Sequence, residues 1–138
     1  MSELHELAGV VRAWIEKAEH DLKTAEHTLR LSDDCPFDTI CFHAQQCAEK
    51  YLKALLVYSR REFPKTHDLA ALLRLLSSEP TLQTDVDALL ALNRYTVEAR
   101  YPGDWEPMDR PEAERAVELA RKLRTAVRAL LPKDILGS

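Results

Sequence analysis

The side chains best suited to bind a ligand lie along one arc of a single helical segment. Gln46, Lys50 and Lys53 follow one another at steps of three or four residues, and Gln45 and Glu49 are spaced in the same way. Residues at these steps are neighbours on the surface of a helix, so the side chains meet on one face. Two interpretations stay open: a solvated face that carries a Glu49–Lys53 ion pair, or a polar surface whose amino groups bind phosphate.

A second group of candidates flanks a Pro-Gly turn at residues 102–103. Arg94, Arg100 and Tyr101 lie before this turn. Two guanidinium groups and a phenol can hold a phosphate and stack on a base. In the alternative interpretation, Tyr101 and Trp105 close the end of the fold while Arg100 pairs with a carboxylate.

Two histidines could add to these groups. His43 lies seven residues before Lys50 and close to its helical angle, which places it at the margin of the polar arc. His67 stands at a helix start, where a histidine more often bonds the local backbone than takes part in catalysis.

Templates for metal or covalent chemistry are absent from the sequence. It contains no Gly-rich phosphate loop, no HExxH and no GxSxG. Cys35, Cys41 and Cys47 form no CxxC pair, and Lys23 and Thr24 rather than a carboxylate occupy the helical turn midway between His20 and His27. We therefore expect three reduced cysteines, no metal site and no cofactor, and we assign no catalytic residue.

Composition bounds the class of protein. The chain has 138 residues, 46% of them hydrophobic and 30% charged, with a net charge of −4. These values predict one globular domain over residues 1–138, without the global basic excess typical of nucleic-acid-binding proteins. The N-terminus lacks the pattern of a signal peptide, and no apolar run approaches the roughly 20 residues of a membrane span. We expect a cytoplasmic protein that does not contact membranes.

Helical periodicity runs through nearly the whole chain. Apolar residues recur at three- and four-residue steps in five segments: 11–29, 36–60, 66–76, 84–97 and 109–131. Pro36 fits the first turn of the second helix, Thr66 can cap the third, Thr84 or Thr81 can open the fourth, and Asp109 caps the last. The second segment is the most apolar and should be central, although Phe42 lies exposed within its polar arc. An all-α fold follows, an antiparallel up-and-down bundle of four to five helices.

Three motifs resemble one known family. Residues 42–56, FHAQQCAEKYLKALL, resemble the core helix of HEPN domains, the "higher eukaryotes and prokaryotes nucleotide-binding" family. Residues 66–69, THDL, are similar to its third-helix signature, and Tyr95 with residues 98–102, EARYP, to its fourth-helix and loop signature. Trp14, Ala18, Asp21 and Leu22 match the first helix more loosely. The resemblance covers a core of about residues 10–131.

The resemblance implies a helical bundle that usually forms a homodimer. It also implies a polar cleft beside the second and fourth helices, near the dimer axis, that binds a nucleotide or RNA. Many members act with a nucleotidyltransferase-like partner in modules that resemble toxin–antitoxin systems. On this basis Lys50, Lys53, Arg94 and Arg100 are expected to contact phosphate. Tyr101 and His43 are expected to contact the base or to position the cations.

Many HEPN proteins are metal-independent ribonucleases that carry an Arg, four to six further residues and a His on the fourth helix. Here Arg94 stands at the Arg position, but the His positions hold Ala99, Arg100 and Tyr101. Because arginine stays protonated, it cannot replace the general base. Three hypotheses follow: a binding protein without catalysis, a ribonuclease toxin with a non-standard site, and a dimeric interaction module. We favour the first and do not expect an enzyme.

Overall fold

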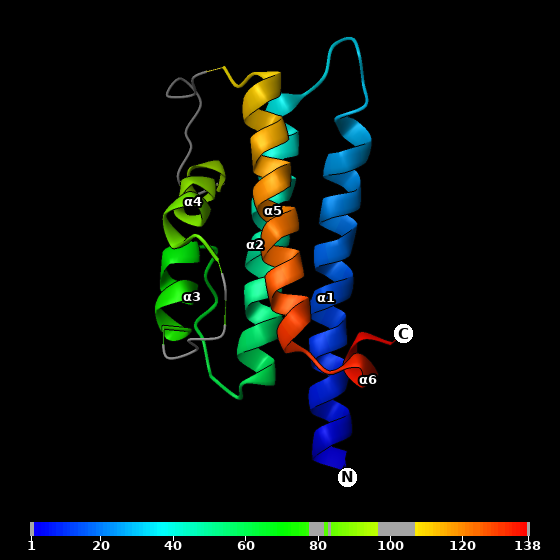
Figure 1. Cartoon of the computed structure of the whole chain (residues 1–138), viewed down its shortest axis with the longest axis vertical. Coiled ribbons are helices and arrows are strands. Elements are labelled where there is room, and N and C mark those ends of the chain that lie inside the picture. Colours follow the sequence, from blue (N-terminus) through cyan, green and yellow to red (C-terminus); the bar gives the residue numbers. More distant parts are fainter. Residues whose placement is uncertain (1, 78–81, 83, 97–106, 138) are drawn as a thin grey trace.

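The computed structural model describes residues 2–77, 82, 84–96 and 107–137, which contain six α-helices, one 3-10 helix and no strand. The elements are α1 Ser2–Thr28, α2 Phe37–Tyr58, α3 Leu69–Leu75, α4 Val86–Leu90, η1 Ala91–Tyr95, α5 Arg110–Leu130 and α6 Lys133–Leu136. Three long helices, α1, α2 and α5, run side by side, and the short α3 and α4 stack along the bundle (Figure 1). The predicted all-α bundle is confirmed.

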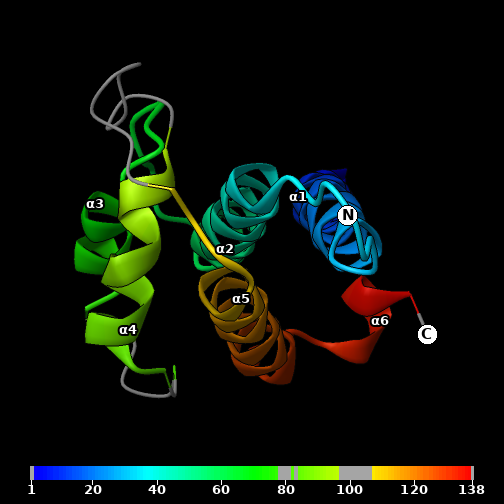
Figure 2. The ribbon, with the colours of Figure 1, turned by 90° about the horizontal axis from the view of Figure 1, so that it is seen from above.

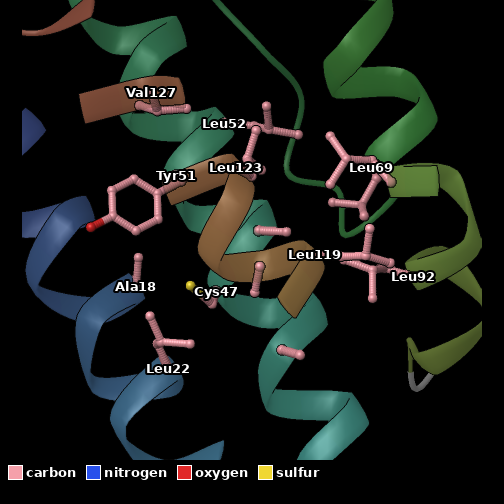
Figure 3. Close-up of a cluster of buried hydrophobic side chains, with 14 of the residues drawn as sticks. Ala18, Leu22, Cys47, Tyr51, Leu52, Leu69, Leu92, Leu119, Leu123 and Val127 are labelled. Atoms are coloured by element: carbon pink, nitrogen blue, oxygen red, sulfur yellow. The ribbon is translucent and has the colours of Figure 1, made fainter. Parts of the chain in front are cut away.

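The helix α2 occupies the centre of the bundle, as its wide apolar surface predicts. It packs against α1, α5, α3 and η1 (Figure 2). Figure 3 shows Cys47 and Tyr51 of α2 beside Ala18 of α1, with Leu69 and Leu92 on the opposite side of the core. Residues such as Leu52, Leu55 and Leu56 are buried, and each fully buried leucine contributes about 1.5–3 kcal/mol to folding.

The helix ends correct two of the expected caps, those of α3 and α4. Asp109 caps α5 as predicted, but Asp68 rather than Thr66 caps α3, because its carboxylate accepts from the Ala70 amide at 3.0 Å. The Thr66 hydroxyl instead accepts from the Asp68 amide at 3.1 Å. Asp85, not a threonine, caps α4. Aspartate and threonine are both good caps, so a sequence that contains both leaves the choice to the local backbone.

The fourth predicted helix differs most from the structure. Only Val86–Leu90 is α-helical, and the chain continues as the 3-10 helix Ala91–Tyr95. Val97 lies outside the described residues. The short α6 was not predicted, because Pro132 indicates the end of α5. A proline also suits the start of a helix, and its φ of −63° leads directly into α6.

A clamp joins the ends of α1 and α5. The Arg110 guanidinium donates to the carbonyl oxygens of Leu29 and Leu31 at 2.8 and 2.7 Å, and it lies 5.1 Å from the centre of the Phe37 ring. Both carbonyls belong to the residues that follow the last residue of α1, where no further helical turn supplies an amide partner, and Arg110 satisfies both. Within the described residues, no helix is both long enough and apolar enough to cross a membrane.

Candidate functional site

The polar arc of α2 is largely buried, which corrects the interpretation of a solvated face. Gln45, Glu49 and Lys53 are only 0%, 2% and 6% exposed. The predicted Glu49–Lys53 ion pair is present, with 3.0 Å between Oε2 and Nζ. Two aromatic rings flank Lys53, whose ammonium lies 5.3 Å from the Trp14 ring centre and 6.0 Å from that of Phe63.

The buried Glu49 carboxylate also holds His67. Its Oε1 lies 2.9 Å from Nδ1 of His67, and the Gln46 amide donates to the same oxygen at 3.3 Å. The Gln45 amide donates to the His67 carbonyl oxygen at 3.0 Å. The His67 side chain is 50% exposed, whereas that of Glu49 is 2% exposed. A buried carboxylate therefore orients an imidazole that reaches the surface.

A second carboxylate brings together two predicted site residues. Asp21 on α1 accepts from the Lys50 ammonium through Oδ2, and its Oδ1 lies 2.8 Å from Nδ1 of His43. The side chains of His43 and Lys50 are 26% and 20% exposed. Phe42 was expected to be exposed, but it is half-buried and its ring meets that of His43 edge-on, with 5.4 Å between the ring centres.

Arg94 is the most exposed predicted site residue that the structure describes. Its side chain is 57% exposed, and its guanidinium lies 3.5 Å from the Glu112 carboxylate and 5.4 Å from the Tyr95 ring centre. The Tyr95 hydroxyl donates to Glu112. Burial and this hydrogen bond raise the pKa of Tyr95. Arg100 and Tyr101 lie outside the described residues, so their contribution to the site stays a prediction.

Asn93 connects η1 to the start of α3. Its Oδ1 accepts from the Leu69 amide at 2.9 Å, and its Nδ2 donates to Asp68 at 2.6 Å. The hydrogen bond from Asn93 lowers the pKa of Asp68, helped by the bond from the Ala70 amide. His67 precedes Asp68 and Arg94 follows Asn93. The two site residues are therefore joined along the chain through one doubly hydrogen-bonded contact.

Several of these partners had no recognisable signal in the sequence. The Glu49–Lys53 pair follows from helical spacing, but the contact from Glu49 to His67 spans 18 residues and that from His43 to Asp21 spans 22. The expectation that His67 bonds the local backbone misses its contact with Glu49. Among the described residues, no three His, Cys, Asp or Glu side chains could together hold a metal ion.

A family model and two solved structures are similar to this chain over most of its length. The HEPN domain family model matches residues 11–130. The crystal structure of TT1696 from Thermus thermophilus has a TM-score of 0.69 and 33% identity, covering 88% of this chain and 98% of that chain. ST0689, an archaeal HEPN homologue, is similar in fold, with a TM-score of 0.67 and 24% identity, covering 87% of this chain and 96% of its own. No curated protein matches the chain.

Proposed function

The chain belongs to the HEPN domain family, and from this premise we propose that it binds the phosphate of a nucleotide or RNA. The surface that supports this function combines α2, the connection from α2 to α3, and η1. One observation carries the proposal. The buried Glu49 holds the half-exposed His67, and the Asn93–Asp68 hydrogen bond ties the residue that follows His67 to the residue that precedes the exposed Arg94.

This arrangement favours an anion because one donor, His67, is held by Glu49 before binding, while the other, Arg94, is exposed. A guanidinium and an imidazole can both donate to phosphate oxygens, and charged hydrogen bonds of this kind are about twice as strong as neutral ones. Side chains already fixed by packing lose less conformational entropy when a ligand binds. The 3.5 Å separation between Arg94 and Glu112 leaves that guanidinium only weakly engaged.

The six predicted site residues have different roles in this proposal. Arg94 contacts the phosphate, together with Arg100 and Tyr101 from the loop outside the described residues. Lys53 is ion-paired and buried, so it orients Glu49 rather than contacting the ligand. Lys50 and His43 share the Asp21 carboxylate and line the edge of the site.

Calorimetric titration with a nucleoside triphosphate and with a short single-stranded RNA tests this function. Arg94→Ala should weaken binding and should reduce the slope of log affinity against log salt by about one. Arg121→Ala is the matched control. Arg121 is 48% exposed and pairs with glutamates, as Arg94 does, but it lies on α5, outside the proposed surface. Equal affinities for the wild type and Arg94→Ala would exclude Arg94 from the site.

We further propose that the chain acts with a nucleotidyltransferase-like partner in a toxin–antitoxin-type module. The resemblance to HEPN domains supports this role. Expression of the chain alone should then slow bacterial growth, and co-expression of a nucleotidyltransferase encoded beside it should restore growth. Unchanged growth during verified expression of the folded chain would contradict a toxin role.

A metal-independent ribonuclease is the second candidate, and the Glu49–His67 contact favours it. A histidine that donates Nδ1–H to a carboxylate carries its acceptor lone pair on Nε2, and such an imidazole can take the proton of a 2′-hydroxyl. Arg94 would stabilise negative charge on the attacked phosphate. Labelled RNA should then be cleaved in EDTA by the wild type but not by His67→Gln or Arg94→Ala. If the wild type does not cleave the RNA, the ribonuclease candidate is rejected and phosphate binding stays as the proposed function.

A further inference from the structure

The connection from α2 to α3, residues 59–67, carries a net positive charge beside the candidate site. It contains three cations, Arg60, Arg61 and Lys65, and one carboxylate, Glu62, whereas the whole chain has a net charge of −4. All four residues are exposed. Within the described residues, neither Arg60 nor Lys65 has a hydrogen-bond or ion-pair partner. These two cations can therefore meet an anionic ligand without giving up another contact.

Arg60 occupies a backbone position that usually favours glycine. It follows Ser59, the C-cap of α2, and its φ of 57° lies in the left-handed region. The amides of Arg60 and Arg61 donate to the carbonyl oxygens of Val57 and Leu56 at 3.0 and 2.9 Å, which closes the last turn of α2. The residue after the cap in such an ending is usually glycine, because a Cβ is strained there. Strain of this kind is found where a side chain serves a function.

Contacts at three points hold the connection against the rest of the fold. The Arg61 guanidinium donates to a carbonyl oxygen at the end of α3, at 2.9 Å. The Phe63 ring meets the Trp14 ring edge-on, with 6.3 Å between the ring centres. The Gln45 amide donates to the His67 carbonyl oxygen at 3.0 Å. The two unpaired cations therefore lie on an anchored segment, which loses little conformational entropy when a ligand binds.

The connection runs back along the polar arc of α2 (Figure 1). Its Phe63 ring centre lies 6.0 Å from the Lys53 ammonium, and His67 contacts Glu49, which is about 6 Å nearer the start of α2. Lys65 lies between Phe63 and His67 in the chain. It is two residues from His67, so their Cα atoms are at most about 7 Å apart. The unpaired cations therefore precede His67 along one path beside α2.

We propose that Arg60 and Lys65 form a second phosphate-binding subsite, which holds the backbone of a single-stranded RNA that continues from the candidate site. The inference deepens the proposed function and rests on it, because another phosphate of the same strand lies at Arg94. A mononucleotide carries its phosphates in one short group, whereas a strand carries one per nucleotide and can follow cations spaced along a path. The path joins the proposed phosphate site at His67, which favours an RNA strand over an acidic protein segment.

Calorimetric titration with an oligouridine octamer and with a nucleoside triphosphate tests the subsite. Arg60→Gly and Lys65→Ala should each weaken octamer binding about two- to fivefold, the range expected for one exposed ion pair. Each should also reduce the slope of log affinity against log salt by about 0.7. The affinity for the triphosphate should stay unchanged. Lys122→Ala is the matched control, because Lys122 is an exposed lysine on α5, away from the path.

The melting temperature separates ligand contact from a role in folding. Arg60→Gly removes a Cβ from a left-handed backbone, so it should not lower the melting temperature followed by circular dichroism. Arg60→Lys should keep most of the octamer affinity, because it keeps the positive charge. Weaker octamer binding by Arg60→Gly at an unchanged melting temperature would support the subsite.

Three results would overturn the subsite. The first is an octamer affinity that is equal for the wild type, Arg60→Gly and Lys65→Ala. The second is a matching loss of triphosphate affinity, which would place both cations in the mononucleotide site. The third is displacement of the octamer by a polyglutamate peptide at equal concentration, which would assign the connection to an acidic protein segment.

Failure of the proposed function gives a different result. Arg94→Ala should weaken the binding of both the octamer and the triphosphate if the proposed function holds. If Arg94→Ala binds both ligands as the wild type does, the site at Arg94 is rejected. If it weakens both while Arg60→Gly and Lys65→Ala weaken neither, the proposed function stands and only the second subsite is rejected.

Discussion

Removing the charge of Glu49 should destabilise the fold far more than removing an exposed glutamate. Glu49→Gln leaves the Lys53 ammonium, whose side chain is 7% exposed, without its carboxylate. Breaking a buried ion pair by removing one partner costs about 3–5 kcal/mol, because the remaining charge stays buried. Lys53→Met should cost less, since Glu49 keeps its hydrogen bonds with His67 and Gln46.

A double-mutant cycle isolates the pair. Urea unfolding of Glu49→Gln, Lys53→Met and the double variant, followed by circular dichroism, should give a coupling energy of about 1.5–3 kcal/mol that persists in 1 M salt. The control cycle uses Glu26 and Arg121, whose side chains are 36% and 48% exposed, and should give at most about 1 kcal/mol, lost in salt. Equal couplings in the two cycles would refute the argument that burial strengthens the Glu49–Lys53 pair.

Three further predictions follow from individual contacts. Asn93→Ala should lower the unfolding free energy by about 1–3 kcal/mol. The pKa of Asp68 is lowered in the folded protein. The difference in unfolding free energy between the wild type and Asn93→Ala should therefore be full above the unfolded pKa of about 4, and it should shrink as pH falls through the folded pKa of Asp68. Burial raises the pKa of Tyr51, so the stabilisation by its hydroxyl should be full below pH about 10 and lost as pH rises through the folded pKa. The unfolding free energies of Tyr51→Phe and the wild type should then converge. Arg110→Met should cost about 1.5–3 kcal/mol and speed amide exchange in residues 29–36 rather than in α2, because it removes two hydrogen bonds from a charged donor. Unchanged exchange there would show that the clamp does not hold this connection.

The spacing of residues within a single helix was enough to predict the long helices of the fold. A helix repeats every 3.6 residues, so the spacing of apolar residues identifies α1, α2 and α5 and the central position of α2. The same spacing identifies the Glu49–Lys53 pair. Local pattern is weaker for short elements, where α4 gives way to η1 after five residues and a proline both ends α5 and begins α6.

The partners between elements could not be predicted, because they depend on packing angles and on loop paths. Glu49 reaches His67 only when the connection after α2 folds back along the helix. Asp21 reaches His43 and Lys50 only when α1 and α2 lie in one particular register. The polar arc of α2 looks solvated in the sequence, but Trp14 and Phe63 lie close to Lys53, and His67 contacts Gln45 and Glu49.

The charges of this arc also explain why Arg94 is the strongest candidate for phosphate contact. Within the described residues, Lys50 and His43 share Asp21, and Lys53 is paired with Glu49. To bind these residues, a phosphate would have to replace Asp21 or Glu49 as their partner. The carboxylate would then stay in a largely buried position without its counter-charge, which costs free energy. At Arg94 the competing carboxylate lies 3.5 Å away and the side chain is 57% exposed, so an anion can bind without breaking a buried pair. The buried pairs therefore hold the site in shape, while Arg94 is left to contact the ligand.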